Sequence, residues 1–535
     1  MRHDIHFTII KAIQKKYRGV SHVEFSVSIP DGPEYGDYAT NAAFLLAKKL
    51  QKPPLDIARE LAAECAEEKM FKKVSVAASG FINFWLSDEV LYGELGEILQ
   101  KKNTYGKLQT TNYKLSTINI EFISANPTGP LTIGNGRGAF LGDVLANILS
   151  FSGSKVTREY YINDAKASTQ IQELGKAILR RSEAYPGPYT DSIKVGLKKK
   201  YATLSEMGGD TVGYLAAQEI QKDNKKTVEK ILKIKFDVWY SEEKLYKNRL
   251  VQKTLNALNG NGVMYQKDGA MWFRASEFGD SEDRVALRTG GAPTYFLPDV
   301  AYHFDKLTKR KFQKVIDILG ADHHGTFPRV VAGLRALGLD AESVTPIFTQ
   351  IARLTRSGKE VKMSKRRGEF VTLEELIKEV GLDAARYFFL EKSPDTHMDF
   401  DLDLAKEQSV KNPVYYIQYA HARITSIFNK VKNRGIFNFQ FSIFKLLKED
   451  EELSLIKKLI QFPEVVADTA NDYQVHRLTR YAYELARVFH NFYEKHRVIT
   501  DDKELTQARL AFVKATQVVL QNVLGLLGIS APKKM

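Results

Sequence analysis

The sequence predicts a multidomain α/β protein in which a doubly wound parallel sheet lies between a small α+β unit and an all-α region. A strand, a glycine-rich turn, a helix and a second strand follow one another between residues 115 and 163. The chain has 535 residues, too many for one hydrophobic core, so about three domains are expected. No proline occurs between Pro463 and Pro532, where apolar residues recur at helical spacing.

The composition indicates a soluble globular protein, with 44% hydrophobic and 27% charged residues. The net charge of +14 favours a polyanionic partner through counterion release, although many basic proteins bind no nucleic acid. With Cys65 alone, the chain can form no internal disulfide and no thiolate zinc cluster, so no zinc is expected. We expect neither a secretory signal nor a membrane span of about 20 apolar residues, and a reducing cytoplasm fits.

Residues 1–105 are predicted to form the α+β unit, with helices at 41–50 and 55–68 and strands at 23–29 and 81–86. Residues 106–400 form the sheet domain, in which about 150 residues separate two of the strands. A single crossover between two parallel strands needs far fewer residues than this, so a largely helical insertion is expected at about 170–275. Residues 401–535 are expected to form a helical bundle whose aromatic stripe, 478–493, belongs to its core.

The first candidate site is the turn Pro130–Gly138, PLTIGNGRG, between a strand and a helix. Gly134 and Gly136 leave room for a ligand to approach the backbone, and the helix amino end attracts phosphate. Thr132 and Asn135 add side-chain donors. By itself, such a turn could also be an ordinary tight turn.

The second candidate site is the loop 361–368, VKMSKRRG, which follows a strand-like run at 347–354. Clustered cations beside a triphosphate would stabilise the charge on a departing pyrophosphate. Alone, this loop could also be a solvated basic segment.

The two sites together resemble the signatures of class I aminoacyl-tRNA synthetases, His-Ile-Gly-His and Lys-Met-Ser-Lys-Ser. The second is intact, whereas Thr132 and Asn135 replace both histidines of the first. Further segments, in order along the whole chain, resemble the arginyl-tRNA synthetase family: 36–50, 80–87, 121–149, 236–246, 293–306, 320–330, 383–390, 412–424, 489–498 and 527–532. One departure is Asn163–Ser168, where the family usually has Asn-Asp-Ala-Gly-Asn-Gln.

The resemblance implies a class I Rossmann-like (HUP) catalytic domain at 106–400, an N-terminal domain that grips the tRNA elbow and a C-terminal anticodon-binding bundle. It implies that the protein, expected to be a monomer, uses ATP with Mg²⁺ to convert L-arginine into its adenylate. The arginyl group then passes to the terminal adenosine of arginine tRNA. The family charges the 2′-hydroxyl and generally needs tRNA before it activates arginine.

The resemblance also implies site residues. The catalytic residues would be Lys362, Lys365, Thr132 and Asn135. The ATP-binding residues would be Thr132, Gly134, Asn135, Gly136, His323, His324, Lys362, Met363, Ser364 and Lys365. The arginine-binding residues would be Ser124, Asn126, Glu242, Tyr295 and Asp299.

Each assignment has a plainer alternative. Asp299 follows a proline and could cap a helix. His323 and His324 could be an ordinary loop pair, and no metal site is expected there without a third ligand. At the level of the whole protein, one rival is a non-catalytic tRNA-binding paralogue, suggested by the missing histidines. The other is a small-molecule adenylyltransferase, which would not need the helical C-terminal region.

Overall fold

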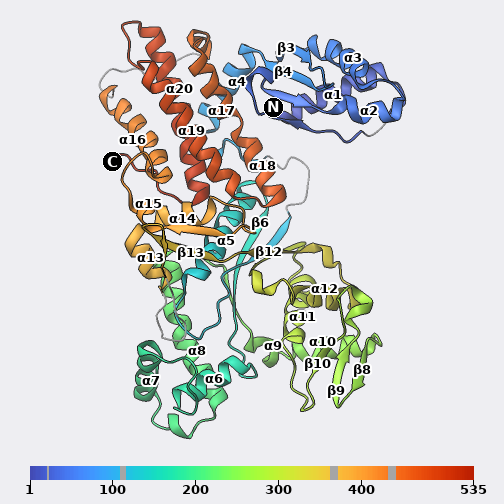
Figure 1. Cartoon of the computed structure of the whole chain (residues 1–535), viewed down its shortest axis with the longest axis vertical. Coiled ribbons are helices and arrows are strands. Elements are labelled where there is room, and N and C mark those ends of the chain that lie inside the picture. Colours follow the sequence, from blue (N-terminus) through green and yellow to red (C-terminus); the bar gives the residue numbers. More distant parts are fainter. Residues whose placement is uncertain (21–22, 109–115, 362–370, 432–440) are drawn as a thin grey trace.

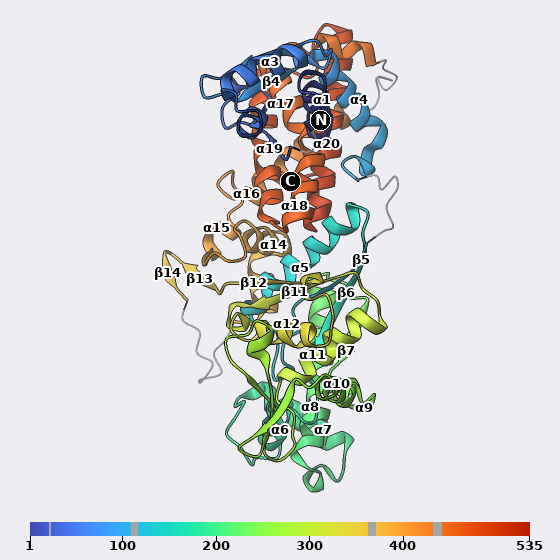
Figure 2. The same ribbon diagram turned by 90° about the vertical axis from the view of Figure 1, so that its right-hand side faces the viewer.

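The structure is a computed structural model that describes residues 1–20, 23–108, 116–361, 371–431 and 441–535. The chain forms an elongated molecule with the parallel sheet near its middle (Figure 1). The C-terminal helices and the N-terminal unit lie side by side at one end, and two lobes lie at the other. Figure 2 shows the same order along the long axis from a second side.

The N-terminal unit is a four-stranded antiparallel sheet, in the order β1-β2-β4-β3, covered by three helices. Both predicted helices and both predicted strands are confirmed, although the first strand is short. The elements are α1 (Arg2–Lys16), β1 (Val27–Ser28), β2 (Tyr38–Thr40), α2 (Ala42–Leu50), α3 (Pro54–Ala66), β3 (Phe71–Val76) and β4 (Ile82–Leu86). Helix α3 begins with a proline at its first position, where the missing N–H has no helical partner to lose.

The N-terminal unit is fixed to the C-terminal helices. Helix α4 (Asp88–Lys101) leaves the unit, and Tyr92 donates to the Leu447 carbonyl at 2.9 Å. On the unit itself, Arg2 pairs with Asp468 at 2.6 Å, and Tyr38 donates to Glu464 at 3.0 Å. The two ends of the chain therefore form one continuous body around α4.

The central sheet has five parallel strands in the order β12-β11-β5-β6-β7. The predicted strand–turn–helix–strand unit is confirmed as β5, α5 and β6, with Ile118, Ile120 and Phe122 buried. The elements are β5 (Thr117–Glu121), α5 (Ile133–Phe151), β6 (Lys155–Ile162), β7 (Val238–Ser241), α11 (Phe296–Phe304), β11 (Lys314–Gly320), α12 (Phe327–Ala336) and β12 (Val344–Thr349).

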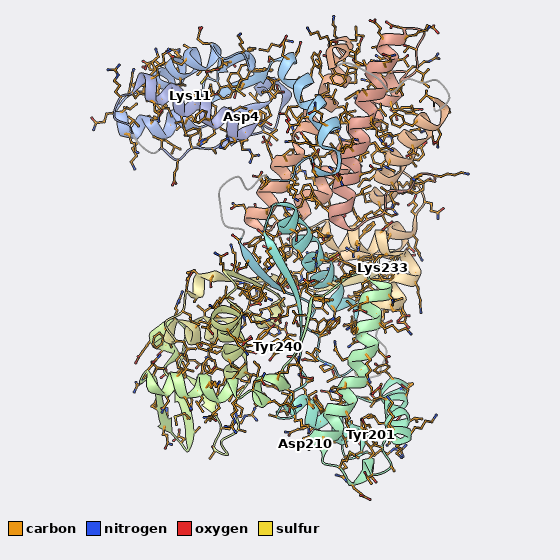
Figure 3. The ribbon with its side chains drawn as sticks, turned by 180° about the vertical axis from the view of Figure 1, so that it is seen from behind. Asp4, Lys11, Tyr201, Asp210, Lys233 and Tyr240 are labelled. Atoms are coloured by element: carbon orange, nitrogen blue, oxygen red, sulfur yellow. The ribbon has the colours of Figure 1, made fainter. Side chains whose placement is uncertain are left out.

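The expected single insertion at about 170–275 is in fact two lobes, because β7 returns to the sheet between them. The first lobe is helical and has its own apolar core, with α6 (Thr169–Ile178), α7 (Pro188–Lys200) and α8 (Gly209–Lys226). In Figure 3, Asp210 marks the start of α8, within the lobe, and Lys233 lies beyond the other end of that helix.

The second lobe adds a three-stranded antiparallel sheet, β10-β9-β8, to two helices. Its elements are α9 (Glu243–Lys247), α10 (Leu250–Gly260), β8 (Met264–Lys267), β9 (Ala270–Phe273) and β10 (Arg284–Leu287). The two lobes follow the carboxyl ends of β6 and β7, so they flank the edge of the sheet where ligands bind in such folds.

After the sheet, a small three-stranded sheet, β14-β13-β15, and short helices lead to the C-terminal bundle. The elements are β13 (Ala352–Arg356), β14 (Lys359–Glu360), α13 (Leu373–Val380), α14 (Leu382–Leu390), β15 (Met398–Asp401), α15 (Leu402–Lys406), α16 (Pro413–Val431), α17 (Asp450–Ile460), α18 (Phe462–Asp472), α19 (His476–Lys495) and α20 (Lys503–Leu527). The aromatic stripe lies on α19 and packs largely into the core, as predicted.

Helix α20 corrects one expectation from the sequence. In the described part of the chain, it is the one helix long and apolar enough to cross a membrane, by length and composition alone. However, 78% of its most apolar window is buried inside the protein. A buried core helix has the same composition, and α20 is the central helix of the bundle.

One buried side chain, Arg386 on α14, ties the bundle to the sheet domain. Its guanidinium pairs with Asp143 of α5 at 2.8 Å and donates to the carbonyl of Leu232 at 3.0 Å. A longer contact of 3.4 Å reaches the carbonyl of Leu527, at the end of α20. Arg386 therefore links α5, the helix that carries the first glycine-rich motif, to the end of α20, the last helix of the chain.

Candidate active site

The residues that follow the second motif lie against the first motif. The Leu373 N–H donates to the Leu131 carbonyl at 2.9 Å, and Thr132 and Thr372 form an isolated antiparallel bridge. The fold therefore returns the chain to the start of α5 once the second motif has been passed. Four predicted site residues lie outside the part of the chain that the structure describes: Lys362, Met363, Ser364 and Lys365.

Thr132 and Asn135 form a capping box at the start of α5. The Thr132 N–H donates to Asn135 Oδ1 at 2.9 Å, and the Thr132 hydroxyl donates to the same oxygen at 3.3 Å. Both side chains thus help to begin the helix. Two kinds of donor remain for a phosphate: the backbone N–H groups of the first turn, and Asn135 Nδ2, which has no hydrogen-bond partner within the described ranges.

The two glycines of this turn have different roles. A Cβ on Gly134 would meet only Thr132 Oγ1, at 3.6 Å, so the surface above it is open. A Cβ on Gly136 would lie 2.9 Å from Phe389 and 3.0 Å from Leu373. Gly136 is therefore required by the packing of α5 against α13 and α14, which the sequence alone did not indicate.

His323 and His324 lie at the carboxyl end of β11, on the same edge of the sheet. Both are exposed. The His324 ring stacks on Phe348, with ring centroids 3.7 Å apart, which fixes its orientation. His323 is left facing solvent, with Asp322 4.0 Å away.

Ser124 joins the carboxyl ends of β5 and β6. Its hydroxyl donates to Glu121 at 3.0 Å and accepts the Tyr161 N–H at 3.1 Å, while Asn163 Nδ2 donates to its carbonyl at 3.0 Å. Ile123 and Ser124 both have positive φ, 69° and 39°, an uncommon conformation that these bonds hold in place. The strained turn redirects the chain away from the sheet edge.

The negative charge of Asp299 raises the pKa of Glu242, so the two carboxyl groups lie near each other. Burial, then the charges of Asp299 and Asp164, raise the pKa of Glu242 from its ordinary 4.5 to about 8. Burial raises the pKa of Asp299 to about 7, against the opposing charge of His303. Neither carboxylate forms a salt bridge with any described residue. Two carboxylates without a cation form a site suited to a positively charged ligand.

The remaining predicted arginine-site residues are less buried. Tyr295 is 49% exposed and directly precedes α11, and its carbonyl accepts the Asp299 N–H at 3.3 Å. Asp299 thus lies in the first turn of α11 and is not its N-cap. Asn126 is exposed in the loop between β5 and α5, where its carbonyl accepts the Thr128 N–H at 2.8 Å.

A buried charge network beneath this site was not predicted from the sequence. Lys306, fully buried, donates to Glu121 at 2.7 Å and to Asp317 at 3.0 Å. His303 lies 2.7 Å from the same Asp317 and 2.8 Å from the carbonyl of Asp299. Burial by itself would raise the pKa of Asp317, but the charges of Lys306 and His303 outweigh burial and lower this pKa. The network fixes α11, and with it Asp299, onto β5 and β11. Its only signal in the sequence is polar residues within apolar runs.

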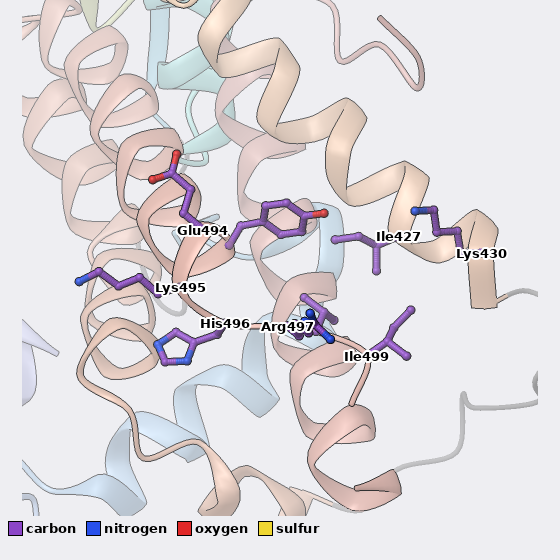
Figure 4. Close-up of a pocket in the computed structure, with 9 residues that line it drawn as sticks. Ile427, Lys430, Glu494, Lys495, His496, Arg497 and Ile499 are labelled. Atoms are coloured by element: carbon purple, nitrogen blue, oxygen red, sulfur yellow. The ribbon is translucent and has the colours of Figure 1, made fainter. Parts of the chain in front are cut away.

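A cavity of about 360 Å³ lies in the C-terminal bundle, between α16 and the segment after α19 (Figure 4). Its lining includes Lys430, Lys495 and Arg497. Tyr493 also lines it, and its ring is stacked by the Arg423 guanidinium, 5.2 Å from the ring centroid. Cations beside aromatic rings are the groups that bind single-stranded nucleic acid.

Comparisons with known proteins agree with this architecture. Three family models match: the arginyl-tRNA synthetase N-terminal domain at residues 3–86, the class I (R) tRNA synthetase catalytic domain at 198–430 and the DALR anticodon-binding domain at 417–535. The chain is 43% identical over 529 residues to an arginine–tRNA ligase of Desulforamulus reducens, covering 96% of this chain and 94% of the relative. It is 42% identical over 537 residues to that of Geobacillus kaustophilus, covering 95% and 94%.

Solved structures lead to the same family. A structure described as a putative arginyl-tRNA synthetase from Campylobacter jejuni superimposes with a TM-score of 0.74 at 31% identity, covering 84% of this chain and all of that one. Together with the family models and the near full-length identity to curated relatives, this establishes that the chain belongs to the arginyl-tRNA synthetase family.

Proposed function

We propose that the protein is an arginine–tRNA ligase that forms arginyl-adenylate from L-arginine and ATP and transfers the arginyl group to arginine tRNA. The observation that carries this proposal is the pair Glu242 and Asp299, one buried and one partly buried carboxylate, neither in a salt bridge with a described residue, in the class I catalytic domain. A guanidinium needs planar acceptors of this kind.

In the first step, an oxygen of the arginine carboxylate attacks the α-phosphorus of ATP. The bond between the α-phosphorus and the oxygen that bridges it to the β-phosphate breaks, and that oxygen leaves as part of pyrophosphate. Mg²⁺ bound to the phosphates would offset the charge of this leaving group. The backbone of 134–136 and the Asn135 amide hold phosphate oxygens, with Thr132 fixing Asn135. His323 and His324 border the nucleotide. Lys362 and Lys365, with Met363 and Ser364 between them, stabilise the charge on the departing pyrophosphate.

In the arginine pocket, Asp299 pairs with the guanidinium and Tyr295 covers it. Glu242 faces the same cation or the ammonium group, and Ser124 and Asn126 hold the amino-acid end beside the ATP site. No described side chain is an evident general base, so catalysis rests on positioning and charge stabilisation. The fixed α11, held by Lys306 and His303, supplies that positioning.

In the second step, the 2′-hydroxyl of the terminal adenosine attacks the adenylate carbonyl, and AMP leaves. Residues 1–105 grip the tRNA elbow and 401–535 read the anticodon, for which the cationic cavity beside α16 is suited. Net charge +14 favours this polyanionic partner. The contact of α20 with α5 through Arg386 gives anticodon binding a direct route to the ATP helix. We further propose a cytoplasmic monomer.

The rival is a non-catalytic tRNA-binding paralogue, favoured by the absence of both signature histidines. One assay separates the two: ATP–pyrophosphate exchange with each amino acid, in the presence and absence of arginine tRNA. A ligase exchanges with arginine and needs the tRNA, whereas a paralogue binds the tRNA and exchanges with no amino acid. Exchange with another amino acid would reject the arginine assignment.

A further inference from the structure

Tyr161, the second-last residue of β6, has a buried hydroxyl without a hydrogen-bond partner. Its side chain is 5% exposed. The ring packs in a cluster with two others: its centroid is 4.4 Å from that of Tyr302 and 6.2 Å from that of Tyr240. Its hydroxyl oxygen contacts no donor or acceptor in the described residues at hydrogen-bond distance. The ring position is therefore fixed while its polar end is unsatisfied.

The neighbouring tyrosines on this part of the sheet differ from Tyr161. The Tyr302 hydroxyl donates to Glu159, and that of Tyr240 lies 3.5 Å from Asp305. The Tyr160 hydroxyl lies 3.5 Å from the carbonyl of Ala125. Since buried polar groups in proteins are nearly always paired, the Tyr161 hydroxyl needs a partner that the described residues do not supply.

The surroundings of this hydroxyl are those of the proposed arginine pocket. The Tyr161 N–H donates to Ser124 at 3.1 Å, and the next carbonyl, of Ile162, accepts the Glu242 N–H at 2.9 Å. Burial, followed by the charges of Glu242 and Asp299, raises the pKa of Tyr161 well above its ordinary value. The hydroxyl is therefore neutral, and can accept one hydrogen bond while donating another.

We infer that the Tyr161 hydroxyl is a third acceptor for the substrate guanidinium, beside the carboxylates of Glu242 and Asp299. This inference rests on the proposed function. A guanidinium has five N–H groups in one plane, more than one bidentate carboxylate can accept. A neutral acceptor on a strand, packed against Tyr302, adds a hydrogen bond in the plane of the guanidinium without adding a charge.

The substitution Tyr161→Phe tests this, because it removes only the unpaired oxygen. We expect the arginine Kd, from calorimetry, to rise roughly threefold to tenfold. The ATP KM and the tRNA Kd should not change. The melting temperature of the free protein should not fall, because no internal hydrogen bond is lost. Tyr160→Phe, one residue earlier, is the matched control, and its arginine Kd should equal that of the parent protein.

Agmatine, which has the guanidinium but no carboxylate, identifies the end of the substrate that is contacted. Tyr161→Phe should weaken agmatine binding by the same factor as arginine binding. If Tyr161→Phe weakened the binding of arginine but not that of agmatine, the guanidinium contact would be overturned. An unchanged arginine Kd would overturn the inference altogether. The proposed function is judged separately, on the parent protein: it fails if the parent does not attach arginine to arginine tRNA.

Discussion

Arginine binding should release protons, because Glu242 and Asp299 are partly protonated in the free pocket. With a pKa of about 8, Glu242 is ionised in about 3% of molecules at pH 6.5 and about 75% at pH 8.5. A guanidinium requires the ionised form, and stays charged throughout this range. Arginine binding should therefore tighten roughly 25-fold between these pH values from Glu242 alone.

The perturbation is Glu242→Gln, which keeps the shape of the side chain and removes its titration. The remaining pH dependence, from Asp299 with a pKa of about 7, should be roughly fourfold over the same range. Calorimetry at pH 7 in buffers of different ionisation enthalpy counts the protons. We expect about 1.4 protons released per arginine in the parent protein and about 0.5 in the variant. A pH-independent arginine Kd without proton release would refute this account of the pocket.

The same two carboxylates should make the free protein less stable as pH rises. Their folded pKa values lie above the ordinary values of 4.5 and 3.8, so the folded state binds more protons than the unfolded state between them. Their contribution to stability is complete below about pH 4 and is lost as pH rises through 7 and 8. The melting temperature without arginine should fall between pH 5 and pH 8.5 more in the parent than in Glu242→Gln. Saturating arginine should reduce that fall.

Three further substitutions test other parts of the site. Asp299→Asn should lower kcat/KM for arginine at least about a hundredfold, with an unchanged ATP KM. The reason is that removing one partner of a desolvated charge pair costs roughly 3–5 kcal/mol of binding free energy. Near-parental charging would exclude the pairing of Asp299 with the guanidinium. Lys306→Met leaves the buried Glu121 carboxylate without a cation and Asp317 with His303 alone, and should reduce the unfolding free energy by about 3–5 kcal/mol in urea titrations. An unchanged midpoint would mean that the network does not stabilise the fold. Lys365→Ala should lower kcat of pyrophosphate exchange with little change in the arginine KM; a pure KM effect would instead indicate ground-state binding.

The sequence by itself determined the local units and the family. Strand alternation, the glycine-rich turn and helical spacing predicted β5, α5 and β6, because these patterns depend on neighbours in the chain. The strand β7 was missed because only four residues, Val238–Ser241, form it. Nothing in so short a run shows that it joins a sheet begun more than a hundred residues earlier.

The tertiary structure alone decided which polar groups meet. Lys306 lies 185 positions from Glu121 along the chain, yet their charged atoms are 2.7 Å apart. The proximity of Glu242 to Asp299, and the isolation of the Tyr161 hydroxyl, depend on the order β11-β5-β6-β7 and on how α11 returns to it. Pairing of distant segments is set by the packing of whole elements, and no residue pattern within any one of those segments encodes its partner.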